Sequence, residues 1–598
     1  MLQGLFLRRV LRPLAAASLV FLLAACGSSA APQLGVPTTP AEPTPPVISK
    51  PQVPVAEDHA GTIANYTLIS PVDGAEIPIT VFEPIEMKKG GQYPLVLFSH
   101  GWGGTRSTAR DFFTNNINER GMYCITFDQR GFGASTGMVR TMDPDYEGQD
   151  MIAILDWAET LPGLARFPDG RMKLGSVGGS YGGMYQFALA GSDPEHRLRV
   201  IAPDVAPFDI NEALYPGKVW KGGWGAQLIA GLVPPLGKGD PVTVQAFSNG
   251  QNNNTLSESE QNYFAYHSLR YFCDGKQPGP QSFAIGTADT FKVPPGPLPP
   301  IDALVIQGFR DSLFNINHAV DSYDCLKKLG GQVMLFTHQS GHIFSQASIT
   351  NVPGLEDGID PAFAVVTPPN SGDVAGNHQC GTVNSGDVTW AYFEEKLLGK
   401  TGAIAKASKA GSDICISLRQ GDAIAVKAMK IGGTSFEIDG STPQFNGAVS
   451  TVTGTIGEAV REQLLATQIF TTMPAGGGII AGIPTMDITL SPMAGAPASG
   501  DPILFLGIGW RKAGQQRFDL LDDQLTPVRG FGQHKGRMVG IAERLGEGDE
   551  LALLVYGSHL QYPQNNSRDL MTPALNIGGT VALPLLDATE ITKEKESL

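Results

Sequence analysis

The run Val177-Gly178-Gly179-Ser180-Tyr181-Gly182-Gly183 constrains the fold of this 598-residue chain more than any other segment. It follows an apolar stretch, Lys173 to Val177, that suits a buried strand, and it precedes Met184 to Ala190, which suits a helix. A strand, a tight turn and a helix leave Ser180 on a sharp bend, where side chains at Gly178 and Gly182 would clash. The pattern predicts that the Ser180 hydroxyl is held out at the carboxyl edge of a sheet, beside the positive end of a helix.

A serine in this setting is either the nucleophile of a G-x-S-x-G elbow or part of an ordinary strand–helix turn. A nucleophile needs a base and an orienting acid, in the chain order Ser, Asp or Glu, His. Asp311 follows a predicted strand at 303–308, and His342 follows another at 333–336, with a helix-like block at 318–329 between them. Both residues lie just past a strand's carboxyl end, where active sites of open α/β sheets lie. The spacing therefore predicts a triad of Ser180, Asp311 and His342.

His338 is the rival base. It comes directly after the strand at 333–336, where packing is expected to hold a side chain, whereas Gly341 before His342 suits a loop that presents the ring. We favour His342 as the base and expect His338 to be structural.

Acyl transfer also needs hydrogen-bond donors aimed at the developing oxyanion. One is expected from the backbone N–H of Tyr181, the residue after the nucleophile. The other is expected from the loop His100-Gly101-Trp102-Gly103-Gly104, which follows a predicted strand at 94–99 and resembles the HGGG-type motif. Within that loop, Trp102 is the favoured donor, with Gly101 as the alternative, and His100 is expected to pack beneath the loop.

Together these motifs resemble the Xaa-Pro dipeptidyl-peptidase-like hydrolases, the S15 family that includes cocaine esterase-type enzymes. The resemblance rests on the loop Asp128–Ser135, with its D-x-R-G-x-G-x-S pattern, on 178–183, on Gln307-Gly308 leading to Asp311, on Gly341-His342, and on the C-terminal segments 548–551, 562–566 and 578–584. It implies an α/β-hydrolase sheet with an inserted helical cap, followed by a C-terminal all-β, jelly-roll-like sandwich. Cocaine esterase-like members place a Tyr side chain in the oxyanion hole, whereas the loop at 100–104 looks like that of lipases and general esterases. That difference favours an ester over a peptide substrate.

The N-terminus predicts a secreted lipoprotein. A basic region with Arg8, Arg9 and Arg12 precedes a short apolar stretch at 14–25, which is shorter than the ~20 residues that span a bilayer and is typical of a signal peptide. Leu23-Ala24-Ala25-Cys26 resembles a bacterial lipobox with Cys26 lipidated, the alternative being a plain secretory peptide. The expected location is the cell envelope, on the outer membrane or the periplasmic face if the cell is Gram-negative.

The chain is expected to divide into a signal peptide (1–25), a Pro-rich linker (26–60), an α/β-hydrolase domain (61–400, with the cap at about 205–300) and a β-sandwich domain (401–598). The cap carries many aromatic residues, among them Trp220, Trp224, Tyr263 and Phe264, which either line an apolar substrate cavity or form the cap's own core.

The cysteines and the net charge allow predictions about disulfides and about the ligands that the protein does not bind. An oxidising envelope permits disulfides, and of the three pairings open to four of the cysteines we favour Cys273–Cys325 and Cys380–Cys415, with Cys124 unpaired in a buried strand. The formal net charge is −15 and no basic cluster is present, so nucleic-acid binding is not expected. No metal-ligand spacing or nucleotide-binding loop is found, so no metal or cofactor is expected.

The sequence therefore predicts a serine hydrolase that cleaves carboxylic esters or amides through an acyl-Ser180 intermediate. An Xaa-Pro dipeptidyl peptidase is the alternative within the same family. A non-enzymatic, surface-binding lipoprotein is the alternative of another class.

Overall fold

The computed structural model describes residues 52–276, 293–296, 298–342, 378–411, 413–419, 421–445, 463–495, 500–559, 561–562, 572–594 and 597–598. The chain divides into residues 1–46 and residues 47–598, and the description below concerns only the second unit. The predicted signal peptide, Cys26 and most of the predicted linker lie outside the described residues.

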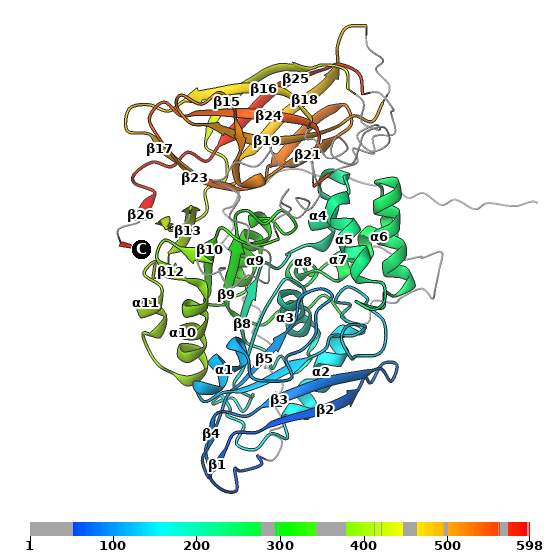
Figure 1. Ribbon diagram of the computed structural model, residues 1–598, viewed down its shortest axis with the longest axis vertical. Coiled ribbons are helices and arrows are strands. Elements are labelled where there is room, and N and C mark those ends of the chain that lie inside the picture. Colours follow the sequence, from blue (N-terminus) through cyan, green and yellow to red (C-terminus); the bar gives the residue numbers. More distant parts are fainter. Residues whose placement is uncertain are drawn as a thin grey trace, which may run out of the picture. The chain divides into compact units, whose positions relative to one another are not determined.

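A large, mostly parallel sheet forms the centre of the hydrolase domain (Figure 1). Its order in the described chain is β2-β3-β6-β5-β7-β8-β9-β10-β13-β14-β26. The strands are β2 Ile63–Ile69, β3 Glu76–Phe82, β5 Leu95–Ser99, β6 Tyr123–Phe127, β7 Leu174–Gly179, β8 Val200–Asp204, β9 Asp302–Gly308, β10 Val333–His338, β13 Ile414–Arg419, β14 Asp422–Val426 and β26 Ile591–Lys593. From β6 to β13 neighbouring strands run parallel, so their carboxyl ends meet along one edge.

Helices cover both faces of this sheet. The helices are α1 Phe112–Glu119, α2 Glu147–Ala158, α3 Tyr181–Ser192, α9 Ile316–Lys328, α10 Ser385–Leu398 and α11 Ala403–Ala407. Leu95 and Leu97 of β5 pack into the core shared with α2, α3 and α9, whereas Val96 packs into the core shared with α1 and α10. Successive side chains of a strand point to opposite faces, so a sheet covered on both faces needs nearly continuous apolar strands. This requirement explains the apolar runs that predicted the sheet.

A helical cap is inserted between β8 and β9. It consists of α4 Ile210–Leu214, the 3-10 turn η1 Pro216–Lys218, α5 Gly222–Gly231, α6 Pro241–Asn253, α7 Glu258–Tyr266 and α8 Leu269–Asp274. Most of its aromatic rings pack on one another: Phe247 lies 5.6 Å from Trp220 and 5.7 Å from Phe264, measured between ring centroids. These rings form the cap's core, and Trp224 and Phe247 also reach the site described below.

The C-terminal part contains two antiparallel sheets, β15-β25-β18-β22 and β16-β24-β19-β20 with β21 beside β19. A single apolar core is shared by side chains of both sheets, as in a β-sandwich. The elements are β15 Thr434–Thr442, β16 Gln463–Thr472, β17 Gly478–Gly482, β18 Thr485–Pro492, β19 Ile503–Arg511, β20 Asp519–Leu520, η3 Leu521–Asp523, β21 Thr526–Arg529, β22 Gly532–Arg537, β23 Ile541–Leu545, β24 Glu550–Ser558 and β25 Leu575–Leu583. The predicted fold class, an α/β-hydrolase sheet with a helical cap and a C-terminal all-β sandwich, is confirmed.

The boundary between the two domains is less simple than a cut at residue 400. β13, β14 and β26 extend the central sheet, so the sandwich strands lie between β15 and β25 and the chain then returns to the hydrolase domain. The sequence could not tell whether β13 and β14 join the central sheet or the sandwich, because a short apolar strand has the same residue pattern in either sheet.

Two disulfides match the pairing favoured from the sequence. Cys273–Cys325 joins α8 to α9, and Cys380–Cys415 joins the short strand β11 Gln379–Cys380 to β13, while Cys124 is buried in β6 and unpaired. No helix within the described ranges has the length and apolar character needed to cross a bilayer.

Candidate active site

Ser180 occupies a strained turn between β7 and α3. Its backbone has φ 58° and ψ −123°, an arrangement that L residues rarely adopt. A Cβ added at Gly178 would lie 2.5 Å from the Gly182 carbonyl oxygen, and one added at Gly182 would collide with the carbonyl oxygen of Ser99. Both glycines are therefore required by close backbone approach, and the bend presents the Ser180 hydroxyl at the carboxyl edge of the sheet.

Three side chains from separate loops meet at this edge. His342 Nε2 lies 2.8 Å from Ser180 Oγ, and His342 Nδ1 lies 2.7 Å from Asp311 Oδ2. With the ring proton on Nδ1, His342 donates to the carboxylate and leaves the Nε2 lone pair facing the serine hydroxyl. The structure thus brings Ser180, His342 and Asp311 together in the order a nucleophile, base and orienting acid require.

Asp311 is fully buried and its carboxylate accepts four hydrogen bonds. Oδ2 accepts from Nδ1 and the backbone N–H of His342, and Oδ1 accepts from the N–H groups of Leu313 (3.0 Å) and Phe314 (2.7 Å). Gly341 has φ +127°, and a Cβ there would lie 2.7 Å from Asp311. The glycine before His342 therefore allows the close approach of the two loops.

A small apolar cavity of about 30 Å³ adjoins Ser180. Its lining includes Trp102, Met184, Leu214, Phe247, Leu313 and Phe314. Its size and lining suit a small apolar group. Phe314 and Trp224 also lie edge-on to the His342 ring, at 5.1 and 5.9 Å between centroids, and limit its exposure to water.

The loop that was predicted to supply an oxyanion donor is held by His100. His100 Nε2 accepts the backbone N–H of Gln129 (3.1 Å), so Nδ1 carries the proton and donates to the Gly101 carbonyl (2.8 Å). The Gln129 side chain in turn donates to the His100 carbonyl (2.6 Å). His100 is thus a support of the loop, as expected from the sequence.

Trp102 lies beside the cavity with its side chain anchored in the cap. Its Nε1 donates to the Leu228 carbonyl of α5 (3.0 Å), and its ring packs against Phe132 and Tyr181. Tyr181 begins α3, where backbone N–H groups have no intrahelical acceptor. Both predicted oxyanion residues therefore line the cavity that contains Ser180.

The Asp128–Ser135 loop is structural. Arg130 is buried and its guanidinium donates to both oxygens of Asp150 (2.9 Å each) and to Asp73 (2.6 Å). Asp128 accepts from the backbone N–H groups of Arg106 (2.6 Å) and Ala134 (3.0 Å). These contacts fix the turn beside the site without adding a reactive group.

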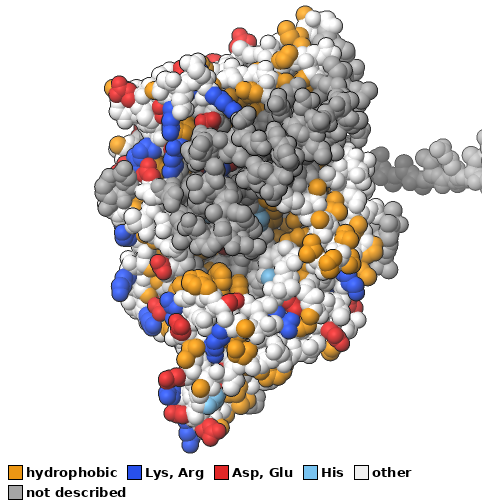
Figure 2. All heavy atoms as spheres, viewed as in Figure 1, with side chains coloured by type: hydrophobic (Ala, Val, Ile, Leu, Met, Phe, Trp, Pro, Cys, Tyr) orange, Lys and Arg blue, Asp and Glu red, His pale blue; other side chains and the backbone are white. Residues whose placement is uncertain are grey.

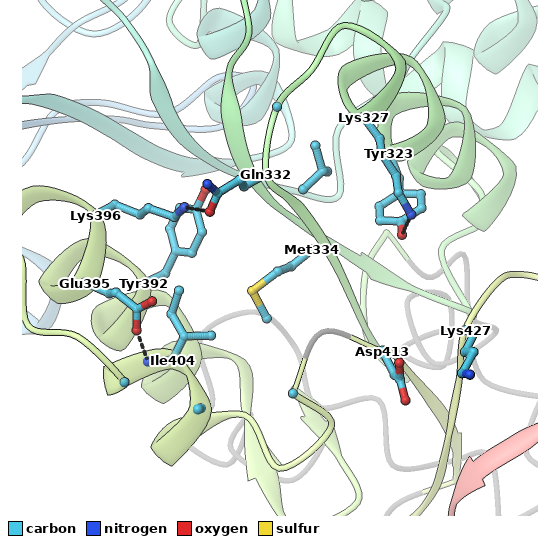
Figure 3. A pocket seen from close by; sticks show the side chains of 15 residues that line it. Tyr323, Lys327, Gln332, Met334, Tyr392, Glu395, Lys396, Ile404, Asp413 and Lys427 are labelled. Carbon is cyan, nitrogen blue, oxygen red and sulfur yellow. Dashed lines mark hydrogen bonds between the residues drawn. The ribbon is translucent and has the colours of Figure 1, made fainter.

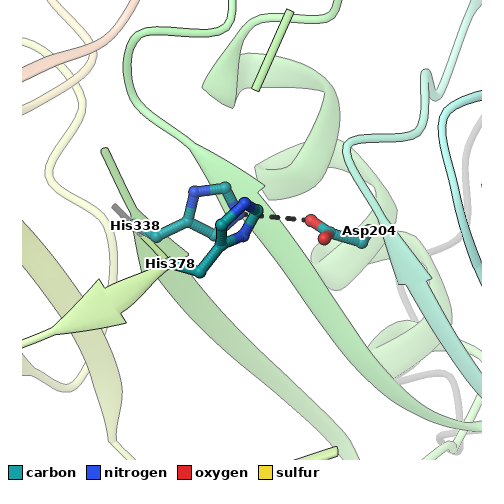
Figure 4. Close-up of side chains that lie close together, drawn as sticks. All are labelled: Asp204, His338 and His378. Carbon is teal, nitrogen blue, oxygen red and sulfur yellow. Dashed lines mark hydrogen bonds and ion pairs between the residues drawn. The ribbon is translucent and has the colours of Figure 1, made fainter. Parts of the chain in front are cut away.

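His338, the rival base, belongs to a different cluster (Figure 4). It is fully buried, its Nε2 lies 3.2 Å from Asp204 Oδ1, and its ring lies 4.6 Å from that of His378. The side-chain ligand atoms of Asp204, His338 and His378 all lie within 4.8 Å of one another, close enough to hold a metal ion together.

The hydrogen bonds of His338 fit a metal poorly. The N–H of Ser340 donates to His338 Nδ1 (3.0 Å), so a neutral ring carries its proton on Nε2 and donates it to Asp204. A metal at Nε2 would force the proton onto Nδ1, against the Ser340 N–H. We therefore interpret the cluster as a support of the β8 and β10 ends.

Two other surface features lie away from Ser180. A cavity of about 640 Å³ opens at the amino end of β10, the opposite edge of the sheet (Figure 3). There Lys396 donates to Asp302 (2.8 Å) and Gln332 (2.7 Å), and Lys327 donates to Tyr323 (2.8 Å). Hydrophobic side chains also gather over the cap (Figure 2), where Val233 and Leu236 are about half exposed.

Two residues that the sequence did not single out hold the Asp311 loop. Lys221, from the cap, and Gln524, from the sandwich, both donate to backbone carbonyls of this loop. A lone lysine within the apolar, Gly-rich segment 219–226 was the available signal for the first. Nothing local marks the second, because its contact joins residues more than 200 positions apart.

The fold and the triad-like site together define an α/β-hydrolase. Residues 73–344 match the family model described as X-Pro dipeptidyl-peptidase (S15 family).

Among solved structures, a CocE/NonD family hydrolase from Staphylococcus aureus is 12% identical, with a TM-score of 0.56, and the match covers 88% of this chain and 94% of that one. An aminopeptidase from a Thaumarchaeota archaeon is 11% identical, with a TM-score of 0.51 and coverage of 88% and 96%. At these identities the likeness establishes the fold, including the sandwich.

Two curated Escherichia coli proteins, both described as an uncharacterized 31.7 kDa protein in the traX-finO intergenic region, are 31% and 30% identical over 128 residues. The matched segment is 21% of this chain, and it spans 42% of the length of these relatives.

Proposed function

We propose that this protein is a serine hydrolase that cleaves carboxylic esters through an acyl-Ser180 intermediate. The observation that carries the proposal is the continuous hydrogen-bonded chain from Ser180 Oγ through His342 to the buried Asp311 carboxylate, 2.8 and 2.7 Å long. The family match supports the same chemistry.

In the first half-reaction, His342 Nε2 takes the Ser180 proton as Oγ attacks the ester carbonyl, and Asp311 stabilises the imidazolium that forms. The backbone N–H groups of Tyr181 and Trp102 receive the developing oxyanion. His342 then returns the proton to the leaving alcohol. In the second half-reaction, His342 activates a water that hydrolyses the acyl-serine.

An ester substrate is favoured over a dipeptide by the position of the acidic groups. A dipeptidyl peptidase needs a carboxylate or carbonyl near the nucleophile to bind the free α-ammonium of its substrate. In the cap, Asp209 caps α4 and pairs with Arg270 (2.9 Å), and Glu260 accepts the backbone N–H of Ser257 in the capping box of α7. Glu212 lines a separate cavity with Asp209, and Glu258 is exposed. Within the described part of the chain, none of these four lines the cavity beside Ser180.

Xaa-Pro dipeptidyl peptidase activity is the second candidate, and the description of the family supports it. The test compares p-nitrophenyl acetate and butyrate with Ala-Pro-p-nitroanilide and its N-acetylated form, using Ser180→Ala as the blank. We expect the esters to turn over much faster and N-acetylation to matter little. A clear preference for Ala-Pro-p-nitroanilide that is lost on acetylation would replace the esterase assignment with the peptidase one.

We also propose that the enzyme is tethered to the cell envelope through a lipidated Cys26. The sequence Leu23-Ala24-Ala25-Cys26 and the Pro-rich segment after it support this tether, since such a segment favours extended chain. A non-enzymatic, surface-binding lipoprotein is the remaining alternative, and it predicts that Ser180 does not react with a fluorophosphonate.

A further inference from the structure

The turn that carries Asp311 is held by a buried lysine from the cap. Lys221, the residue before α5, is 3% exposed, and its Nζ donates to the carbonyls of Ser312 and Leu313, both at 2.9 Å. The Asp311 carboxylate meanwhile accepts the N–H groups of Leu313 and Phe314. The carboxylate thus organises the N–H groups of the turn, and the ammonium binds its carbonyls.

The same helix also reaches the loop of the base. Trp224, one turn along α5, donates from Nε1 to Ser312 Oγ (3.1 Å). The Ser312 hydroxyl and N–H both donate to the His342 carbonyl, at 3.1 and 2.9 Å. Lys221 and Trp224 therefore connect the start of α5 to both loops of the Asp311–His342 pair.

A buried ammonium is costly unless it is compensated. Burial lowers the pKa of Lys221 to about 8, while attraction to Asp311 and Glu212 works in the opposite direction. His318 of α9 also faces Lys221, and it is kept neutral because burial lowers its pKa to about 3. At acidic pH Lys221 therefore carries a positive charge, which the Asp311 carboxylate and the two carbonyls compensate.

We propose that Lys221 is a positioning residue that fixes the Asp311 turn and places a positive charge beside the Asp311–His342 pair. This inference rests on the proposed function. A fixed cation disfavours the appearance of a second positive charge nearby, and the base must be without its extra proton to accept the one from Ser180. The carboxylate of Asp204, which also faces His342, is unchanged in all the variants below. Removing the charge should then move the acid limb of kcat/KM for ester hydrolysis toward higher pH.

Gln524 of the sandwich offers a matched neutral control. Its Nε2 donates to the carbonyls of Phe309 (2.7 Å) and Asp311 (3.1 Å), so it holds the same turn without a charge. The experiment measures pH–rate profiles of the full chain and of Lys221→Met, Lys221→Gln and Gln524→Met. Lys221→Gln keeps two N–H donors and loses the charge. It replaces Lys221→Met as the test of the charge if the Met variant does not fold.

We expect both Lys221 variants to move the acid limb upward by at least ~0.5 pH unit and Lys221→Met to lose roughly ten- to a hundredfold in kcat. Gln524→Met should lower kcat without moving the limb. An unmoved limb in the Lys221 variants, or an equal shift in Gln524→Met, would overturn the inference. Failure of the proposed function would differ, because the wild-type protein would then show neither turnover nor labelling of Ser180.

Discussion

Replacing Asp311 by asparagine should remove the proposed base function of His342 while the His342 side chain stays in place. The carboxylate accepts four N–H groups, and a carboxamide can accept on only one of its two positions. If the amide oxygen stays with Leu313 and Phe314, its NH₂ group faces His342 Nδ1. The ring must then carry its proton on Nε2, so Nε2 donates to Ser180 Oγ and cannot accept the serine proton.

The expected loss in kcat is about 10⁴-fold, which is the size seen when a triad base is held in the wrong tautomer and corresponds to about 5.5 kcal/mol of activation free energy. The free energy of unfolding should fall by only about 1–3 kcal/mol, because the His342 backbone N–H loses its buried acceptor.

The assay is p-nitrophenyl acetate hydrolysis near pH 7.5, with melting temperature and near-ultraviolet circular dichroism as folding controls. Asp302→Asn is the matched control, because Asp302 lies at the amino end of β9, away from Ser180. A folded Asp311→Asn variant that keeps more than a tenth of the wild-type kcat would refute the assignment of Asp311.

Three further predictions follow from the sequence and the structure. His342→Ala should lower turnover by several orders of magnitude and His338→Ala should leave most of it, and the opposite ranking would make His338 the base. Cys26→Ser should abolish acyl labelling and release active protein from membranes, so membrane retention of this variant would contradict the tether. Burial raises the pKa of Asp522 to about 8, so the folded state keeps a proton that the unfolded chain loses above pH ~4. The contribution of this group to the free energy of unfolding therefore falls as the pH rises toward 8. Asp522→Asn should flatten the decline in melting temperature between pH 5 and 8, and an unchanged slope would contradict a raised pKa of Asp522.

Local chemistry made much of the fold and site predictable. Gly178, Gly182 and Gly341 stand at positions where a Cβ does not fit, and the sequence shows such a constraint as a glycine. Asp311 and His342 could be placed because each follows an apolar strand, and parallel strands bring their carboxyl ends to one edge. His338 was separable from His342 for a related reason, since it ends β10 and lies inside the packed sheet.

Long-range pairing set the limits of the sequence analysis. β13 and β14 have the same apolar pattern as sandwich strands, yet they pair in the central sheet because β10 leaves an open edge there. Lys221 and Gln524 could not be assigned to the Asp311 turn, because their partners are backbone carbonyls, which carry no sequence signal. The residues that support the site were thus harder to predict than the three side chains that meet in it.

The most direct test of the account is active-site labelling with a fluorophosphonate, followed by mass spectrometry of the digested protein. Attack by an activated serine predicts a single adduct on the peptide that contains Ser180, its loss in Ser180→Ala, and slow labelling in His342→Ala. Wild-type protein that is folded but takes up no label, or takes it up on a different serine, would contradict the claim that Ser180 is the nucleophile.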